Sequence, residues 1–327
     1  MPGQKPMPVC ILFGPTASGK TEILERLFAG PGAVVPAEVV SADSMQVYRG
    51  MDIGTAKPGQ ELLDRLPHHL IDIKNPDEQF NAGEFVRLAD DACCAITGRG
   101  RLPVISGGTG FYLRNFVLGL PETPPSDPEI RMLLQEELRS RGAEKLMDEL
   151  VRYDPVSAAR IHINDEYRIL RALEVYRSSG RPLSSFSQTG SAPDSDSPRP
   201  AYRFLIIGLR RPREELYHRI NRRAAEMFSQ GLPEEVRRLC EQGYGPGYPG
   251  LRAIGYQEFF VPGEDGGMVL SRDLPGVEVL IARNSRRYAK RQIVFFSSIP
   301  DAVWIDAGPD AAAAIRSKLE AFLASGA

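Results

Sequence analysis

The sequence predicts an α/β protein with a parallel β-sheet flanked by helices and an all-helical insertion. Three observations lead to this prediction. Short apolar runs alternate with helical periodicity from residue 8 to about 118, helices alone follow a proline-rich stretch, and strand character returns at Tyr202. Alternating strands and helices are typical of a parallel sheet. We therefore expect an α/β core with C-terminal helices at residues 1–118 and 202–327, and a helical insertion domain at 119–201.

The expected strands are short apolar runs, and the run at residues 8–13 has the continuous apolar character of a buried parallel strand. Further strands are expected at residues 38–42, 70–73, 102–106, 204–209 and 302–305. A helix is expected at 82–97, because apolar residues recur there at helical spacing.

The insertion is expected to begin with a proline-rich hinge at 120–128. Ser126 or Asp127 is expected to cap the next helix, with Pro128 in its first turn. Helices are expected at 129–141, 143–153 and 165–179. The segment 187–200, rich in Ser, Pro, Asp and Gly, predicts a mobile loop.

Composition is ordinary for a soluble globular protein, with 42% hydrophobic and 25% charged residues among 327. No apolar run approaches the roughly 18 residues of a membrane span, and the first residues lack the apolar core of a signal peptide. The four cysteines lack metal-binding spacing and are expected to be buried, reduced thiols. We therefore expect a cytoplasmic monomer with no membrane partner and no structural zinc.

The formal net charge is −2, but basic residues are concentrated in two segments, 210–223 and 283–291. A basic face on a nearly neutral protein is typical of local polyanion binding. A solvated helix face, with acidic partners such as Glu214 and Glu215, explains either cluster equally well.

Residues 14–21, Gly-Pro-Thr-Ala-Ser-Gly-Lys-Thr, match the phosphate-binding loop (P-loop) pattern G-x-x-x-x-G-K-[ST]. Its glycines let successive main-chain N–H groups point at an anion. Lys20 would bring a positive charge to the terminal phosphate oxygens, and the Thr21 hydroxyl can hold Mg²⁺. A strand precedes the loop and a predicted helix at 22–29 follows it, so the anion would lie at a helix N-terminus. The loop therefore predicts a P-loop NTPase-like core that binds a phosphate chain with Mg²⁺.

Two further loops follow predicted strands. The loop 41–48 places Asp43 at the carboxyl edge of the sheet, where ligands bind in open α/β folds. A carboxylate there can hold Mg²⁺ through water or accept a proton, whereas a helix N-cap is the structural alternative. The loop 106–112 offers the Thr109 hydroxyl at the same edge, although an ordinary strand-to-helix turn explains it too. Three loops converging on one edge predict a binding site.

These segments together resemble the tRNA dimethylallyltransferases, which prenylate the adenosine immediately 3′ of the anticodon. The resemblance runs from about residue 8 to 306, through blocks at 14–21, 41–58, 68–72, 107–112, 164–175, 219–223, 253–258 and 288–292. The P-loop is generic, whereas the block 41–58 and the Ala-Lys-Arg-Gln at 289–292 are diagnostic. The resemblance implies transfer of a dimethylallyl group from dimethylallyl diphosphate to the N6 amine of that adenosine in tRNA, with release of pyrophosphate.

The resemblance also implies roles for individual residues. The diphosphate is expected to contact Gly14, Thr16, Ala17, Ser18, Gly19, Lys20 and Thr21, with Mg²⁺ at Thr21. Asp43 is expected to be the general base, with Thr109 and Arg223 as further catalytic residues. The expected tRNA contacts are Asp43, Ser44, Met45, Gln46, Thr109, Arg131, Tyr167, Arg168, Ile169, Leu170, Arg171, Arg252, Ala253, Ile254, Gly255, Tyr256 and Gln257. Tyr48 is either another contact or a core residue.

The sequence departs from the family pattern after Gln292, where members usually have a Trp and a basic residue. Here stand Phe295, Ser297 and Ser298, which would weaken an RNA contact without removing a catalytic group. We expect no C-terminal zinc finger like that of the eukaryotic members, which suits a bacterial-type enzyme without zinc.

Three other functions are compatible with a P-loop core. They are an adenylate isopentenyltransferase, a small-molecule kinase that uses ATP, and a nucleotide-gated RNA-binding protein without transfer chemistry. The first two need neither the basic helices nor a large insertion, so the sequence favours the tRNA enzyme.

Overall fold

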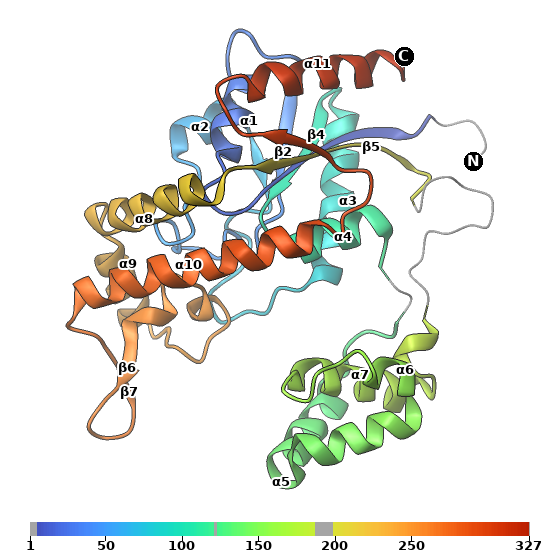
Figure 1. Cartoon of the computed structure of the whole chain (residues 1–327), viewed down its shortest axis with the longest axis vertical. Helices are drawn as coiled ribbons and strands as arrows, with labels where there is room; N and C mark the ends of the chain where they lie inside the picture. The colour runs from blue at the N-terminus through green and yellow to red at the C-terminus, as the bar shows by residue number, and fades with distance from the viewer. Residues whose placement is uncertain (1–4, 121–122, 187–198, 327) are drawn as a thin grey trace. The chain divides into compact units, whose positions relative to one another are not determined.

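The computed structural model describes residues 5–120, 123–186 and 199–326. These residues form two compact units (Figure 1). The α/β unit comprises the described residues of 1–117 and 199–327, and the helical unit comprises those of 118–198.

Six parallel strands in the described part of the chain form the sheet of the α/β unit, in the order β3-β2-β4-β1-β5-β8. The strands are β1 (Met7–Phe13), β2 (Ala37–Ser41), β3 (His68–His69), β4 (Leu102–Gly107), β5 (Tyr202–Arg210) and β8 (Val303–Asp306). Because β5 pairs directly with β1, the chain re-enters the sheet after the insertion beside its first strand. The predicted parallel α/β sheet is confirmed.

Five of the six expected strands lie within two residues of their predicted ends, but the strand predicted at 70–73 is wrong. The nearest strand, β3, ends at His69. The next residues Leu70 and Asp72 have φ of 64° and 56°. These left-handed conformations interrupt an extended chain. The main chain at Ile73 and Lys74 instead donates to the Val47 carbonyl.

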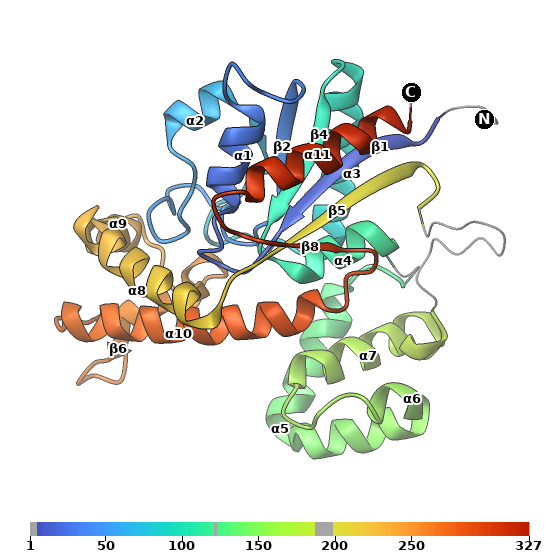
Figure 2. The same cartoon turned by 45° about the horizontal axis from the view of Figure 1, so that its top comes forward.

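Helices cover the sheet on both faces. One face packs on α1 (Lys20–Phe28) and α11 (Ala311–Ala324) through alternate strand side chains such as Cys10 and Leu12. Figure 2 shows α11 running across this face. The remaining helices of the sheet region are α2 (Gln60–Arg65), α3 (Ala82–Gly98) and α4 (Gly110–Leu118). Of the four cysteines, all free, Cys94 is exposed, so the expected burial of every thiol is wrong.

A second core joins the segment after β2 to the C-terminal part of the chain. Its helices are α8 (Arg213–Ser229), α9 (Leu232–Glu241) and α10 (Leu274–Phe296), and it includes the hairpin β6 (Phe260–Pro262) and β7 (Met268–Leu270). Buried side chains from each part, such as Val47, Leu232 and Ile281, pack in one cluster.

Arg199 stands where the chain returns to the α/β unit. Its Nη1 donates to the Phe116 carbonyl (3.0 Å), and its Nη2 pairs with Asp90 (2.8 Å). The guanidinium also lies over the rings of Phe116 and Tyr202, at 4.9 and 4.6 Å. These contacts join the end of α4 to the start of β5.

The helical unit contains α5 (Pro128–Tyr153), α6 (Pro155–Ala158) and α7 (Glu166–Ser179). Asp127 caps α5 by accepting from the N–H groups of Glu129 and Ile130, which confirms one of the two expected caps. Gly142, with φ of 80°, breaks α5 where two helices were expected. Residues 187–198 of the predicted loop and 121–122 of the predicted hinge lie outside the described residues. None of the described helices is long and apolar enough to cross a membrane.

Candidate active site

The loops that follow β1, β2 and β4 meet at the carboxyl edge of the sheet, as the sequence predicts, because β4 lies between the other two strands. The Thr109 N–H donates to the Ala42 carbonyl (3.1 Å), and its hydroxyl accepts from the Ser44 N–H (3.0 Å). Gly107 allows this approach, since a Cβ there would lie 2.1 Å from the Ala42 oxygen. Thr109 therefore ties the β4 loop to the loop that carries Asp43.

The P-loop has the curvature of an anion-binding loop, with Ala17 and Gly19 at φ of 62° and 100°. The Lys20 ammonium lies inside the curve, donating to the carbonyls of Gly14 (2.9 Å) and Pro15 (3.1 Å). Burial and, to a lesser extent, the charge of Arg223 lower the pKa of Lys20 to about 8, while the charge of Asp43 opposes the shift. A bound anion would compensate for this cost of burying a cation. Thr21 is exposed in the first turn of α1.

Three arginines from the segment 210–223 contact successive residues of the P-loop. Arg211 Nε donates to the Ser18 carbonyl (2.8 Å) and Arg219 Nε to the Ala17 carbonyl (2.9 Å). Arg223 Nη1 lies 3.5 Å from Thr16 Oγ1. Burial lowers the pKa of Arg223, and the neighbouring charge of Arg219 lowers it further.

The rest of that basic segment behaves as a solvated face. Arg210 pairs with Asp306 (2.6 Å) and Arg222 with Glu226 (3.3 Å), both among exposed side chains. Part of the segment is therefore a solvated helix face. The arginines that contact the P-loop instead place positive charge where an anion would bind.

Asp43 caps a turn. Its Oδ1 accepts from the N–H groups of Met45 (2.9 Å) and Gln46 (3.4 Å), and the next helix begins only at Gln60. The alternative that Asp43 is a helix N-cap is therefore wrong. The side chain is half-buried and lines a cavity together with Thr16 and Arg223.

This cavity has a volume of about 350 Å³, within the range of small-molecule sites. Polar groups share it with an apolar wall from Ile220, Ala224, Met227, Ile254 and Ile281. Tyr288 of α10 also lines it. Burial, together with the charge of Asp43, raises the pKa of the Tyr288 phenol to about 12, so the hydroxyl keeps its proton. Sequence reasoning did not single out Tyr288, although it directly precedes the diagnostic Ala-Lys-Arg-Gln at 289–292.

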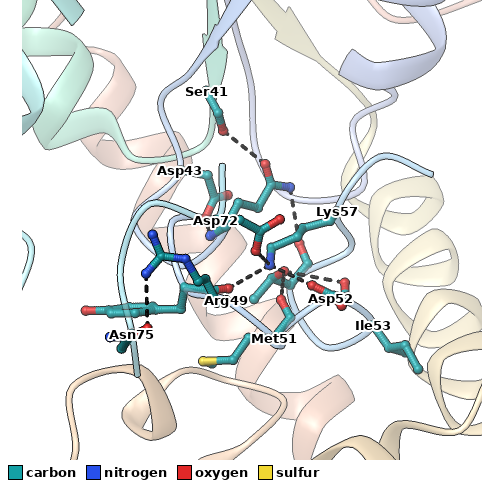
Figure 3. A network of polar contacts seen from close by, with 12 residues as sticks. Ser41, Asp43, Arg49, Met51, Asp52, Ile53, Lys57, Asp72 and Asn75 are labelled. Carbon is teal, nitrogen blue, oxygen red and sulfur yellow. Dashed lines mark hydrogen bonds and ion pairs between the residues drawn. The ribbon is translucent and has the colours of Figure 1, made fainter. Parts of the chain in front are cut away.

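Polar contacts hold the diagnostic block 41–58 together (Figure 3), and its residues 43–45 and 54–56 line the cavity. The Gln46 amide accepts from Ser41 Oγ (3.0 Å) and donates to the carbonyls of Thr55 and Ala56. Lys57 Nζ binds the Tyr48 carbonyl (2.6 Å) and the carboxylates of Asp52 (2.6 Å) and Asp72 (2.5 Å). Tyr48 is itself buried and its hydroxyl donates to the Glu78 carbonyl, so it is a core residue.

Glu235 of α9 fixes the same block from the other side. Its carboxylate accepts from the N–H groups of Asp52 (3.1 Å), Ile53 (2.9 Å) and Gly54 (3.2 Å), and from the Tyr256 hydroxyl (2.6 Å). Glu235 and Tyr256 are buried. No local sequence signal marks Glu235, because its main-chain partners at 52–54 lie some 180 residues away along the chain.

The remaining expected tRNA contacts differ in exposure. In the α/β unit, Arg252 and Gln257 are exposed, whereas the side chains of Ala253 and Tyr256 belong to the second core. In the helical unit, Tyr167 and Arg168 are exposed, and Ile169 and Leu170 belong to the helical core.

Two expected arginine contacts share one buried carboxylate within the helical unit. Arg131 Nη1 pairs with Glu174 Oε2 at 3.0 Å, and Arg171 Nη1 lies 3.3 Å from the same oxygen. Burial raises the pKa of Glu174, but hydrogen bonds from Ser126 and the Asp127 N–H and the charge of Arg171 outweigh it and keep that pKa low. The guanidinium of Arg131 also lies over the Tyr167 ring, 4.8 Å from its centroid.

Three comparisons identify similar proteins. A family model described as IPP transferase matches residues 46–298. The tRNA dimethylallyltransferase of Geobacter sulfurreducens is 44% identical over 298 residues, which cover 90% of this chain and 91% of the relative. The tRNA dimethylallyltransferase 1 of Pelobacter propionicus is 43% identical over 301 residues, or 91% and 92% of the two chains.

The fold is also similar to that of solved transferase structures. The tRNA isopentenylpyrophosphate transferase of Bacillus halodurans is 36% identical with a TM-score of 0.65, and the match covers 98% of each chain. A eukaryotic dimethylallyltransferase described as acting on tRNA has a TM-score of 0.76 at 24% identity, covering 97% of this chain and 80% of that chain. At 24% identity, the similarity to the eukaryotic structure supports the fold alone.

Proposed function

The chain belongs to the IPP transferase family, and from this premise we propose that it is a tRNA dimethylallyltransferase. It transfers a dimethylallyl group from dimethylallyl diphosphate to the N6 amine of the adenosine 3′-adjacent to the anticodon. The observation that carries the proposal is a cavity bounded by both the P-loop and a carboxylate, with Thr16, Arg223 and Asp43 among its lining residues. That arrangement would bring a leaving diphosphate and a proton acceptor to the same small volume.

The reaction forms a bond between N6 and the allylic C1, while the C1–O bond breaks and its electron pair leaves with pyrophosphate. Negative charge grows on the leaving group, so Lys20, Arg223 and the P-loop N–H groups would stabilise the transition state more than the ground state. Asp43 would accept the N6 proton. Because an allylic carbon tolerates partial positive charge, positioning of the two substrates is expected to contribute most.

The P-loop residues fit a bound Mg²⁺. Mg²⁺ binds one or two protein oxygens and completes its coordination with phosphate oxygens and water, and the Thr21 hydroxyl at the start of α1 can supply such an oxygen. Among the described residues, no group of three His, Cys, Asp or Glu side chains could hold a metal ion. When bound, the ion would neutralise charge on the departing pyrophosphate.

The target adenosine would have to leave its stacked loop to reach the cavity. Arg252, Gln257, Tyr167 and Arg168 are exposed and can contact RNA through their side chains. The buried members of the predicted set, Ile169, Leu170, Ala253 and Tyr256, would act through their main chain or by supporting neighbours.

Radiolabelled dimethylallyl diphosphate separates the candidate functions. The protein is incubated with the label, Mg²⁺ and unmodified tRNA, and in parallel with AMP or ATP in place of tRNA. We expect label in tRNA alone. Label in a free nucleotide would indicate an adenylate isopentenyltransferase, and no label anywhere would refute the proposal and favour a kinase.

A further inference from the structure

Three polar side chains lie four residues apart on α10, at positions 284, 288 and 292. Residues at this spacing share one face of a helix. Asn284 Nδ2 donates to Glu258 Oε1 (2.7 Å), in the segment that borders the cavity, and Tyr288 lines the cavity near Asp43. Gln292 reaches the P-loop.

Gln292 makes a bridge between two loops of the active site. Its Oε1 accepts from the Thr16 N–H (2.9 Å), and its Nε2 donates to the Gly108 carbonyl (2.7 Å). The residue is 5% exposed, so neither bond competes much with water. A Cβ at Gly108 would lie 2.6 Å from Gln292 Nε2, so the absence of a side chain at Gly108 makes the bridge possible.

The bridge continues to the expected general base. Gly108 precedes Thr109, whose hydroxyl accepts from the Ser44 N–H, next to Asp43. The P-loop is thus connected to the loop carrying Asp43 through Gln292, the β4 loop and Thr109. A primary amide suits this position, because it offers an acceptor and a donor at once.

We propose that Gln292 is a positioning residue for the transfer reaction, which sets the separation between the diphosphate on the P-loop and the carboxylate of Asp43. The inference rests on the proposed function. Gln292 holds the Thr16 N–H itself, which leaves the later amides of the loop to the diphosphate. Removing the bridge lets the two loops shift independently, and a misplacement of about 1 Å can lower turnover roughly 100-fold.

Two variants test the bridge. Gln292→Leu keeps the approximate size of the side chain and removes both hydrogen bonds. Gln292→Glu keeps an acceptor for Thr16 but turns a carboxylate toward the Gly108 carbonyl and adds a negative charge beside the P-loop. Gln242→Leu is the matched control, since Gln242 is exposed at the end of α9.

The measurements are kcat and KM for both substrates, the affinity for tRNA by filter binding and the affinity for pyrophosphate by calorimetry. All are made at a temperature at which circular dichroism shows every variant folded. For Gln292→Leu we expect kcat to fall roughly 10- to 100-fold with little change in tRNA affinity. Gln292→Glu is expected to lose turnover and also to bind pyrophosphate more weakly, because its added charge repels the anion.

Wild-type turnover in a folded Gln292→Leu variant would overturn the inference. If the affinities of Gln292→Leu for tRNA and for pyrophosphate fell in parallel with its kcat, the role of Gln292 would be purely structural. That result would also overturn the inference. If the wild-type protein transferred no label to tRNA, the proposed function would fail instead, so the two failures are distinguishable.

Discussion

The buried ammonium of Lys20 predicts that diphosphate binding weakens as the pH rises above about 8. Its pKa falls from 10.5 to about 8, which corresponds to about 3 kcal/mol at about 1.4 kcal/mol per pH unit. This free energy disfavours the charged form of Lys20 when no anion is bound to the P-loop. A bound anion favours the charged form, so binding above pH 8 takes up a proton.

The magnitude follows from this pKa. At a pH one unit above a pKa of about 8, only about a tenth of the molecules carry a charged Lys20. Affinity for an anion that needs this charge therefore approaches a tenfold loss per pH unit. Below about pH 7 the ammonium is already charged and Lys20 adds no pH dependence.

Calorimetric titration with inorganic pyrophosphate over a pH series gives the affinity, and buffers of different ionisation enthalpy give the proton uptake. Lys20→Arg is the control, because a guanidinium stays charged throughout this range. We expect the wild-type affinity to fall relative to that of Lys20→Arg above pH 8. Protonation of pyrophosphate itself affects both proteins equally. Parallel curves for the two proteins would refute the reasoning.

Three further substitutions test the roles of Asp43, Glu235 and Glu174. Asp43→Ala is expected to bind tRNA nearly normally and to lose at least about 100-fold in turnover; near-wild-type turnover would remove Asp43 from the mechanism. Glu235→Ala leaves three main-chain N–H groups and the Tyr256 hydroxyl without their acceptor, so the free energy of unfolding in urea should fall by at least about 3 kcal/mol. An unchanged unfolding midpoint would contradict that role. Glu174→Ala leaves Arg131 and Arg171 without their shared carboxylate and should lower stability by about 3 kcal/mol, a loss that thermal unfolding with the exposed variant Glu166→Ala as control would detect.

The sequence was sufficient to predict the location of the site because each of its three loops directly follows an apolar strand. Parallel strands bring their carboxyl ends to one edge, so the P-loop, Asp43 and Thr109 could be placed together without coordinates. The strand predicted at 70–73 failed because apolar side chains do not reveal positive φ values, which here belong to Leu70 and Asp72.

The supporting residues could not be predicted, because their partners are remote in the chain. Gln292 and Thr16 are separated by 276 positions, and Arg211 and Ser18 by 193. The spacing of arginines in 210–223 indicates a charged helix face but does not show that some of them turn toward loop carbonyls. Glu235 resembles any acidic residue in the first turn of a helix until the fold brings the segment 52–54 onto it.

The contacts of Arg199 have a consequence for the connectivity of the chain. This side chain binds the Phe116 carbonyl and Asp90, so the end of α4 and the start of β5 are joined within the α/β unit itself. The entropy of closing a loop grows only slowly with its length, and here the two ends are already held together by local contacts. The α/β unit would therefore accept a connection of a few residues in place of 118–198, and insertions of many lengths could be accommodated at this position without disturbing the sheet.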